Sequence, residues 1–222
     1  MPTELTSDPR GVSLISGIRG MAPPGASPKL PHRLDRVTRG LVLVTLTDEA
    51  IAFHNERLRA GDWTKLYLAR CHAPAEGPAG DLLGIHKAYL KRERHRARVV
   101  HSGGKPSFLE VLAIAPAPDR EGEIHVLIRL MTGRFHQIRA MLANLGMPLV
   151  GDRFYGGEGT WDDLYLEHLA LRYVEAGTGC PTVAHWKDDP DREPVAAEMQ
   201  EAIAERIVRL AEPSAADPGA AP

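Results

Sequence analysis

The strongest pattern in the sequence is a strand followed directly by a helix. Apolar residues occupy every second position between residues 124 and 130, which is typical of a strand with one buried face. A turn at Thr132-Gly133 comes next, and apolar residues then recur at i, i+3, i+4 and i+7 between residues 138 and 145. This spacing predicts an amphipathic helix, which Gly146 is expected to end.

The remaining patterns do not alternate as strand–helix–strand units. We therefore expect an α+β fold, in which helices flank a mixed, largely antiparallel sheet. The further expected strands are a buried one at residues 41–44, a half-buried one at 65–71, and others at 108–115 and 166–173, with at most a short strand at 12–15. Further helices are expected after the N-cap at Thr47-Asp48, ending at Gly61, and between residues 195 and 210.

A chain of 222 residues is long enough for one sizeable domain. Residues 1–30 are rich in Gly, Pro and Ser and predict an irregular lead-in. We expect the domain to cover residues 31–211, followed by a disordered tail at 212–222.

Composition excludes several classes of protein. The formal net charge of −2 excludes a uniformly basic nucleic-acid binder, although local basic patches stay possible. Cys71 and Cys180 have no CxxC or Cys/His spacing, so we expect reduced thiols and no metal site. No segment is apolar enough to span a membrane or to serve as a signal peptide. We expect a soluble, cytoplasmic monomer.

Two segments concentrate residues that can carry chemistry. In the first, residues 32–36, Asp35 is surrounded by His32, Arg33 and Arg36, and these positive neighbours predict a lowered pKa for its carboxyl. The second, residues 132–139, places Arg134, His136, Gln137 and Arg139 at the start of the predicted helix. Because a helix N-terminus favours anions, this cluster suits a phosphate or a buried carboxylate such as Asp35.

These segments and a third one together resemble the RluA-type pseudouridine synthases. His32-Arg33-Leu34-Asp35-Arg36, with Gly40-Leu41 after it, resembles the catalytic loop of that family. Lys65-Leu66-Tyr67-Leu68-Ala69 is similar to its Lys-x-Tyr-x-Ala strand. Residues 132–139 are similar to its third signature, and residues 145–152 to the segment next to that signature. The resemblance covers residues 31–175 and is specific, because three separate motifs agree in order and spacing.

The resemblance implies the pseudouridine synthase fold and a base-flipping reaction on RNA, with ribosomal and transfer RNA both open as substrates. A uridine leaves the stack, its bond to nitrogen is broken, and the base is reattached to the sugar through carbon five. Asp35 is then the essential carboxylate, and attack on the sugar, attack on the base and removal of a proton all stay open. Arg139 is expected beside Asp35, and Tyr67 against the flipped base, with a part in proton transfer also open for Tyr67. The family needs neither a metal nor an organic cofactor.

Further basic residues are expected to bind the RNA. Arg33 suits the gap that the flipped base leaves in the RNA stack. His32, Arg36, Arg134 and His136 are expected to bind phosphate or to orient the loop. Residues 91–98 predict either a solvated charged loop or an RNA-backbone patch that uses Arg94, Arg96 and Arg98.

Two alternatives stay open beside the enzyme. Residues 1–30 do not show the Lys-Pro strand that usually precedes the catalytic loop in the family. This difference favours a catalytically poor RNA-binding protein that retains the fold. A hydrolase using Asp35 is disfavoured, because the sequence shows no partnering acid, metal site or nucleophile constellation.

Overall fold

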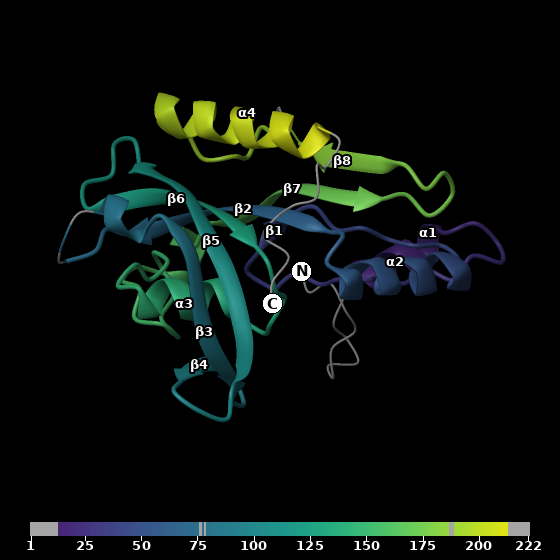
Figure 1. The fold of residues 1–222 in the computed structure, drawn as a ribbon, viewed down its shortest axis with the longest axis horizontal. Helices are drawn as coiled ribbons and strands as arrows, with labels where there is room; N and C mark the ends of the chain where they lie inside the picture. The colour runs from purple at the N-terminus through teal and green to yellow at the C-terminus, as the bar shows by residue number, and fades with distance from the viewer. Residues whose placement is uncertain (1–12, 76, 78, 187–188, 213–222) are drawn as a thin grey trace.

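The computed structural model describes residues 13–75, 77, 79–186 and 189–212. Within them the chain forms an eight-stranded sheet with helices packed against it (Figure 1). The strands are β1 (Arg39–Gly40), β2 (Thr64–His72), β3 (Gly84–Arg92), β4 (Ala97–Val100), β5 (Lys105–Pro116), β6 (Glu123–Leu130), β7 (Leu166–Val174) and β8 (Pro181–His185). The α-helices are α1 (Leu14–Met21), α2 (Asp48–Ala60), α3 (Gln137–Asn144) and α4 (Ala197–Ala211), and short 3-10 turns cover Ala79–Leu82 and Trp161–Asp163.

The strand pairing confirms the predicted α+β class. The strand order is β1-β7-β2-β6-β5-β3-β4, and β8 pairs with β7. Strand β1 runs parallel to β7, and the other pairings are antiparallel. The sheet is therefore mixed and largely antiparallel, as the sequence predicts.

Helices cover both faces of the sheet, so that β2 lies in the middle of the core. On one face, Met141 and Leu142 of α3 belong to the same apolar cluster as Tyr67 and Ala69 of β2. On the other face, α4 packs over Leu68 (Figure 1). The prediction of a half-buried strand at residues 65–71 is therefore wrong, because both faces of β2 are covered.

Local signals set the ends of α2 and α3 as predicted. The Thr47 hydroxyl accepts a hydrogen bond from the backbone N–H of Ala50 at 3.2 Å, which caps the start of α2. Gly61 ends α2 in the left-handed conformation, with φ of 82°. Gly146, with φ of 79°, follows α3 in the same way.

The N-terminal expectations are wrong in two places. Residues 14–21 form helix α1 where at most a strand at 12–15 was expected, because Ser13 and Ser16 form a reciprocal capping box at its start. The predicted strand at 41–44 is absent, and only Arg39–Gly40 joins the sheet. The sequence patterns also did not predict β3, β4 or β8.

The ends of the chain lie largely outside the described residues. Residues 1–12 of the expected lead-in and residues 213–222 of the expected tail fall there, so the proposed domain limits stay a prediction. Among the described residues, no helix has the length and apolar character needed to cross a bilayer.

Candidate active site

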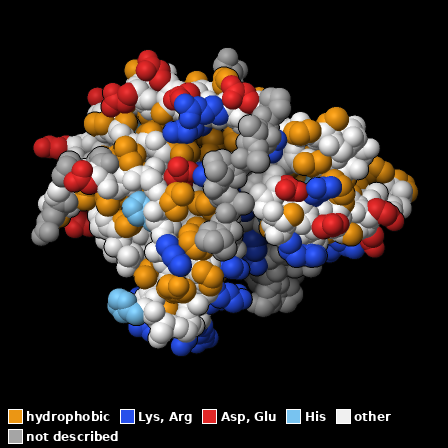
Figure 2. Space-filling view, viewed as in Figure 1, with side chains coloured by type: hydrophobic (Ala, Val, Ile, Leu, Met, Phe, Trp, Pro, Cys, Tyr) orange, Lys and Arg blue, Asp and Glu red, His pale blue; other side chains and the backbone are white. Residues whose placement is uncertain are grey.

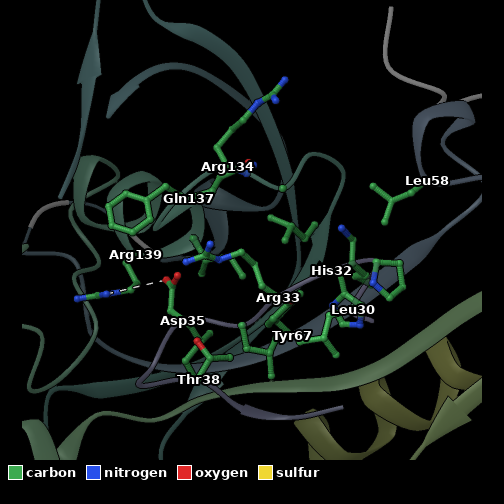
Figure 3. Close-up of a pocket in the computed structure, with 18 of the residues that line it drawn as sticks. Leu30, His32, Arg33, Asp35, Thr38, Leu58, Tyr67, Arg134, Gln137 and Arg139 are labelled. Atoms are coloured by element: carbon green, nitrogen blue, oxygen red, sulfur yellow. Dashed lines mark hydrogen bonds and ion pairs between the residues drawn. The ribbon is translucent and has the colours of Figure 1, made fainter. Parts of the chain in front are cut away.

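Asp35 lies in a cavity of about 410 Å³ that is lined by residues from between positions 30 and 166 (Figure 3). Asp35 comes from the loop before β1, Tyr67 from β2, and Arg139 from α3. The lining holds a single carboxylate among the described residues, that of Asp35, beside several cations. The cations are Arg33, Lys65, Arg92, Arg134 and Arg139. The cations suit an anionic ligand, and the carboxylate of Asp35 suits a neutral part of that ligand beside it.

Packing and hydrogen bonds hold the loop that carries Asp35 in place. Leu34 is buried in the main apolar cluster, next to Asp35 in the chain. His32 accepts a hydrogen bond from the backbone N–H of Leu43 through Nε2 at 2.9 Å. The N–H of Leu41 donates to the carbonyl of His168 at 3.0 Å. These bonds hold residues 41–44 as an ordered loop segment, where the sequence predicted a strand.

The carboxyl of Asp35 is more isolated than the sequence predicts. Its Oδ2 lies 3.9 Å from Nη1 of Arg139 and 4.0 Å from Nε2 of His136, which are long distances for charged partners (Figure 3). Burial raises the pKa of Asp35; the charges of Arg139 and Arg33 oppose this rise, and that of Asp152 adds to it. The expected lowering of this pKa is therefore wrong, because loss of water outweighs the cations.

Arg139 is held by a second carboxylate, that of Asp152. Its Nε and Nη2 donate to the two oxygens of Asp152 at 2.5 and 2.8 Å, and both side chains are buried. This bidentate pair fixes the guanidinium plane and leaves Nη1 on the side of Asp35. Asp152 thus orients the cation of the site, a role that the sequence patterns did not predict.

His136 links the same arginine to the neighbouring hairpin. It accepts a hydrogen bond from Arg139 Nη1 at Nε2, at 3.0 Å, so its proton resides on Nδ1, which faces the Tyr155 hydroxyl at 3.0 Å. The Tyr155 hydroxyl in turn accepts from the N–H of Ala97 in β4 at 2.7 Å. Burial and the charge of Arg139 lower the pKa of His136 to about 3, so the ring is neutral. In this position it orients Arg139, whereas the sequence predicted that it binds phosphate or orients the loop.

Tyr67 has one face covered by another ring. It stacks on His168 with centroids 4.6 Å apart and an angle of 15°. The ring also lines the cavity (Figure 3). Burial and the nearby charge of Asp35 raise the pKa of the Tyr67 hydroxyl, which keeps it protonated. Tyr67 is therefore suited to packing and to hydrogen-bond donation, and unsuited to act as a base.

The predicted RNA-binding residues occupy different places. His32 and Arg33 line the cavity with Asp35, whereas Arg36 is exposed and is not part of the lining. Arg134 lies at the rim and extends away from Asp35 (Figure 3). The arginine with an ion-pair contact to Asp35 is Arg139.

The basic segment at residues 91–98 forms the β3–β4 hairpin. Arg94 is exposed, and Arg96 and Arg98 pair with Glu93 at 3.2 and 2.9 Å at the surface. Arg92 was not singled out from the sequence, yet it lines the cavity and lies 4.5 Å from the centre of the Phe135 ring. Arg92 follows the buried Ala88 and Leu90 at a spacing of two, so it lies on the same face of β3. This spacing was the signal in the sequence that could have identified it.

Among the described residues, no group of three or more His, Cys, Asp or Glu side chains is arranged to hold a metal ion. Of the two cysteines, Cys71 is buried and Cys180 is exposed, and both are free thiols.

Comparison with known proteins identifies the family. The sequence model described as RNA pseudouridylate synthase matches residues 24–144, more than half of the chain. The chain belongs to the RluA-type RNA pseudouridine synthase family. The family match includes all the cavity-lining residues named above.

Curated relatives share about a third of the aligned residues. The dual-specificity RNA pseudouridine synthase RluA of Escherichia coli K12 is 34% identical over 127 residues, 56% of this chain and 55% of the relative. An uncharacterized RNA pseudouridine synthase of Chloroflexus aurantiacus is 31% identical over 164 residues, 72% of this chain and 48% of the relative. The chain thus spans about half the length of these relatives.

Solved structures agree on the fold. Human RNA pseudouridylate synthase domain containing 1 superposes with a TM-score of 0.65 at 22% identity, covering 91% of this chain and 87% of that one. Human RNA pseudouridylate synthase domain containing 4 superposes with a TM-score of 0.55 at 15% identity, covering 84% and 78%. The β-sheet and helices described above are therefore those of a pseudouridine synthase fold.

Proposed function

We propose that this protein converts uridine to pseudouridine in structured RNA, with Asp35 as the essential carboxylate. The supporting observation is the single, partly dehydrated carboxylate of Asp35, placed in a cationic cavity next to an oriented arginine. The reaction breaks the bond between ribose C1′ and N1 of the base and joins C1′ to C5. The proton on C5 is lost and N1 gains one, so atoms and charge balance.

The environment of Asp35 suits either an attacking carboxylate or a base. Removal of water makes the ionised carboxylate more reactive, because hydration no longer stabilises its charge. Arg139 lies close enough to Asp35 to favour the ionised form of its carboxyl, but its two short hydrogen bonds to a carboxylate are made with Asp152. Asp35 is thereby oriented without being neutralised.

The flipped uridine is expected to pack on the cavity side of Tyr67. His168 supports the other face of that ring, so the stacking surface is held in place from behind. Arg33 is exposed at the mouth of the same cavity, where a planar guanidinium can occupy the gap in the RNA stack.

The RNA is expected to cross the β3–β4 hairpin. Figure 2 shows Lys and Arg side chains gathered at the end of the molecule where Figure 1 places the tip of this hairpin. Arg94, Arg96 and Arg98 belong to it, and the ion pairs of Arg96 and Arg98 with Glu93 are exposed and therefore weak. Phosphates can replace such partners, which supports the RNA-backbone interpretation of residues 91–98.

Tritium release tests the proposed reaction. Unmodified transcripts of ribosomal and transfer RNAs, with tritium on C5 of uridine, are incubated with the wild type and with Asp35→Asn. We expect release by the wild type and a loss of at least about 1,000-fold in the variant, because the shape is kept and the charge is removed.

The same assay separates the alternatives. Appreciable turnover by Asp35→Asn would refute the role given to that carboxylate. Binding of RNA by the wild type without tritium release would favour the RNA-binding protein that has kept the fold.

A further inference from the structure

A second cavity of about 520 Å³ adjoins the one that holds Asp35. It lies between the end of α2, the start of β2 and the turn that precedes α3. Five residues line both cavities: Leu58, Lys65, Leu130, Gly133 and Arg134. A ligand whose base occupies the first cavity can therefore extend directly into the second.

Among the described residues, the second cavity is lined by cations and by no carboxylate. Arg59, Lys65, Arg129 and Arg134 contribute to the lining, and Arg129 pairs with Glu110, which lies outside the cavity, at 2.7 Å. The chain as a whole has a formal net charge of −2, so this excess of positive charge is local. A local excess of this kind attracts anions.

Lys65 is the deepest of these cations and differs from the other buried ones. It is 8% exposed, and no hydrogen bond or ion pair of its Nζ is found among the described residues. Arg70 and Arg139, which are also buried, bind Glu193 at 2.9 Å and Asp152 at 2.5 Å. Unlike these arginines, Lys65 has no carboxylate partner among the described residues, and its Nζ is not one of the fully buried, unbonded polar atoms, so the ammonium opens onto the cavity.

The ammonium of Lys65 faces the turn before α3. A Cβ placed on Gly133 would lie 3.6 Å from Nζ, so a larger side chain at this position would cover the ammonium. Burial lowers the pKa of Lys65 to about 8, and the group is still mainly protonated at pH 7. Lys65 is thus a charged donor at the junction of the two cavities.

We propose that Lys65 binds a backbone phosphate of the RNA beside the flipped uridine, in the cavity at the end of α2. The inference rests on the proposed function, since it assumes that a uridine occupies the cavity of Asp35. A phosphate in the second cavity supplies the anion that Lys65 lacks, and Arg59 and Arg134 flank it at the rim. The site would thus bind the nucleotide by its base and by its phosphate.

Mononucleotides test this assignment without knowledge of the target RNA. The probes are uridine, uridine 5′-monophosphate and uridine 3′-monophosphate, and their dissociation constants are measured by NMR titration of the wild type and of Lys65→Met. We expect one monophosphate to bind the wild type at least about tenfold more tightly than uridine, as a charge-assisted hydrogen bond implies. In Lys65→Met we expect this preference to fall to about one- to twofold, so that the monophosphate binds about as tightly as uridine does.

The controls separate loss of charge from loss of the site. Lys87→Met removes an exposed lysine of β3 that lines neither cavity, and it should keep the wild-type preference. Gly133→Val keeps Lys65 but covers its ammonium, and it should reduce the preference as Lys65→Met does. Thermal unfolding of each variant shows that it is folded.

Two results would overturn the assignment: a wild type without phosphate preference, or a folded Lys65→Met that retains it. Tritium release, measured separately, reports on the proposed function. Phosphate preference that depends on Lys65, without tritium release, would refute the isomerase and leave the phosphate site standing. Tritium release without the phosphate preference would refute the phosphate site and leave the isomerase standing.

Discussion

At the scale of single residues, the site contains two carboxylates with different roles: Asp152 holds Arg139, and Asp35 faces the cavity. The sequence predicts Arg139 beside Asp35, and the structure shows a contact at 3.9 Å. The short, bidentate contact of Arg139 is with Asp152. Because Asp152 and His136 already hold the guanidinium, Asp35 does not have to position it and can react while its neighbour stays fixed.

Removing Asp152 should therefore damage both stability and activity. Asp152→Ala leaves the buried charge of Arg139 without its main partner, and we expect a loss of about 3–5 kcal/mol in the free energy of unfolding. Freed from Asp152, Arg139 is expected to turn towards Asp35 and to reduce tritium release. Urea denaturation measures the first effect.

Asp62→Ala is the matched control, because it breaks an exposed pair with Arg57 at 3.1 Å. We expect a change below about 1 kcal/mol there. Equal losses in the two variants would contradict the special position of Asp152.

At the scale of elements, the β3–β4 hairpin is coupled to the helix that carries Arg139. The Tyr155 hydroxyl contacts both the N–H of Ala97 in β4 and Nδ1 of His136 at the start of α3. Residue His136 has φ of 50°, an uncommon conformation for a residue with a side chain. The hairpin and the active-site turn are therefore joined by hydrogen bonds as well as by proximity.

The hairpin arginines should govern the salt dependence of RNA binding. Replacing Arg94, Arg96 and Arg98 by Gln is expected to reduce the slope of log K against log salt by up to about 2 to 3, because each phosphate contact releases counterions. Filter binding of the transcripts at several salt concentrations measures the slope.

The control replaces Arg206 and Arg209 by Gln on α4, which covers the opposite face of the sheet from α3. There the slope should stay at the wild-type value. An unchanged slope in the hairpin variant would argue that residues 91–98 are a solvated surface segment.

At the scale of the whole molecule, two neutral histidines, half-buried His32 and buried His168, lie where the catalytic loop meets the sheet. Burial lowers the pKa of His32 to about 3, helped by the charges of His168 and Lys65. Burial likewise lowers the pKa of His168 to about 4, and Lys65 adds to the effect. His168 also donates from Nδ1 to the carbonyl of Leu41 at 2.6 Å, so one ring joins β7 to the loop.

These histidines should make the fold sensitive to acid. In the unfolded chain each imidazole takes up a proton near pH 6.5, whereas the folded chain resists protonation until pH 3–4. The unfolded state therefore binds more protons in this window. Stability is full above about pH 6.5 and is lost as the pH falls, by about 1–2 kcal/mol per histidine at pH 5.

Urea unfolding at pH 7.5 and pH 5 measures this loss. His168→Gln should show a smaller decrease between the two values than the wild type, because one titrating group is gone. An equal decrease would mean that other groups carry the acid sensitivity.

Sequence patterns alone determined those features that depend on neighbours a few residues apart. The strand at β6, the helix at α3, and the caps of α2 at Thr47 and Gly61 follow from short-range effects, and the structure confirms them. The single buried face expected from the period of two in β6 is wrong, because the structure buries both faces of that strand. The motifs also brought Asp35, Tyr67 and Arg139 together as candidates, and all three line one cavity. Short-range rules failed at residues 41–44, where bonds to His32 and His168 hold an apolar segment outside the sheet.

Only the tertiary structure decided which charged and aromatic groups became partners. The bidentate bond of Arg139 to Asp152, the stack of Tyr67 on His168, and the place of the Lys65 ammonium between two cavities depend on how distant segments meet. Burial of Asp35 reversed the pKa shift that its sequence neighbours predict. The physical reason is that solvation and partner choice are set by the packed surroundings of a group, which neighbouring residues in the chain do not specify.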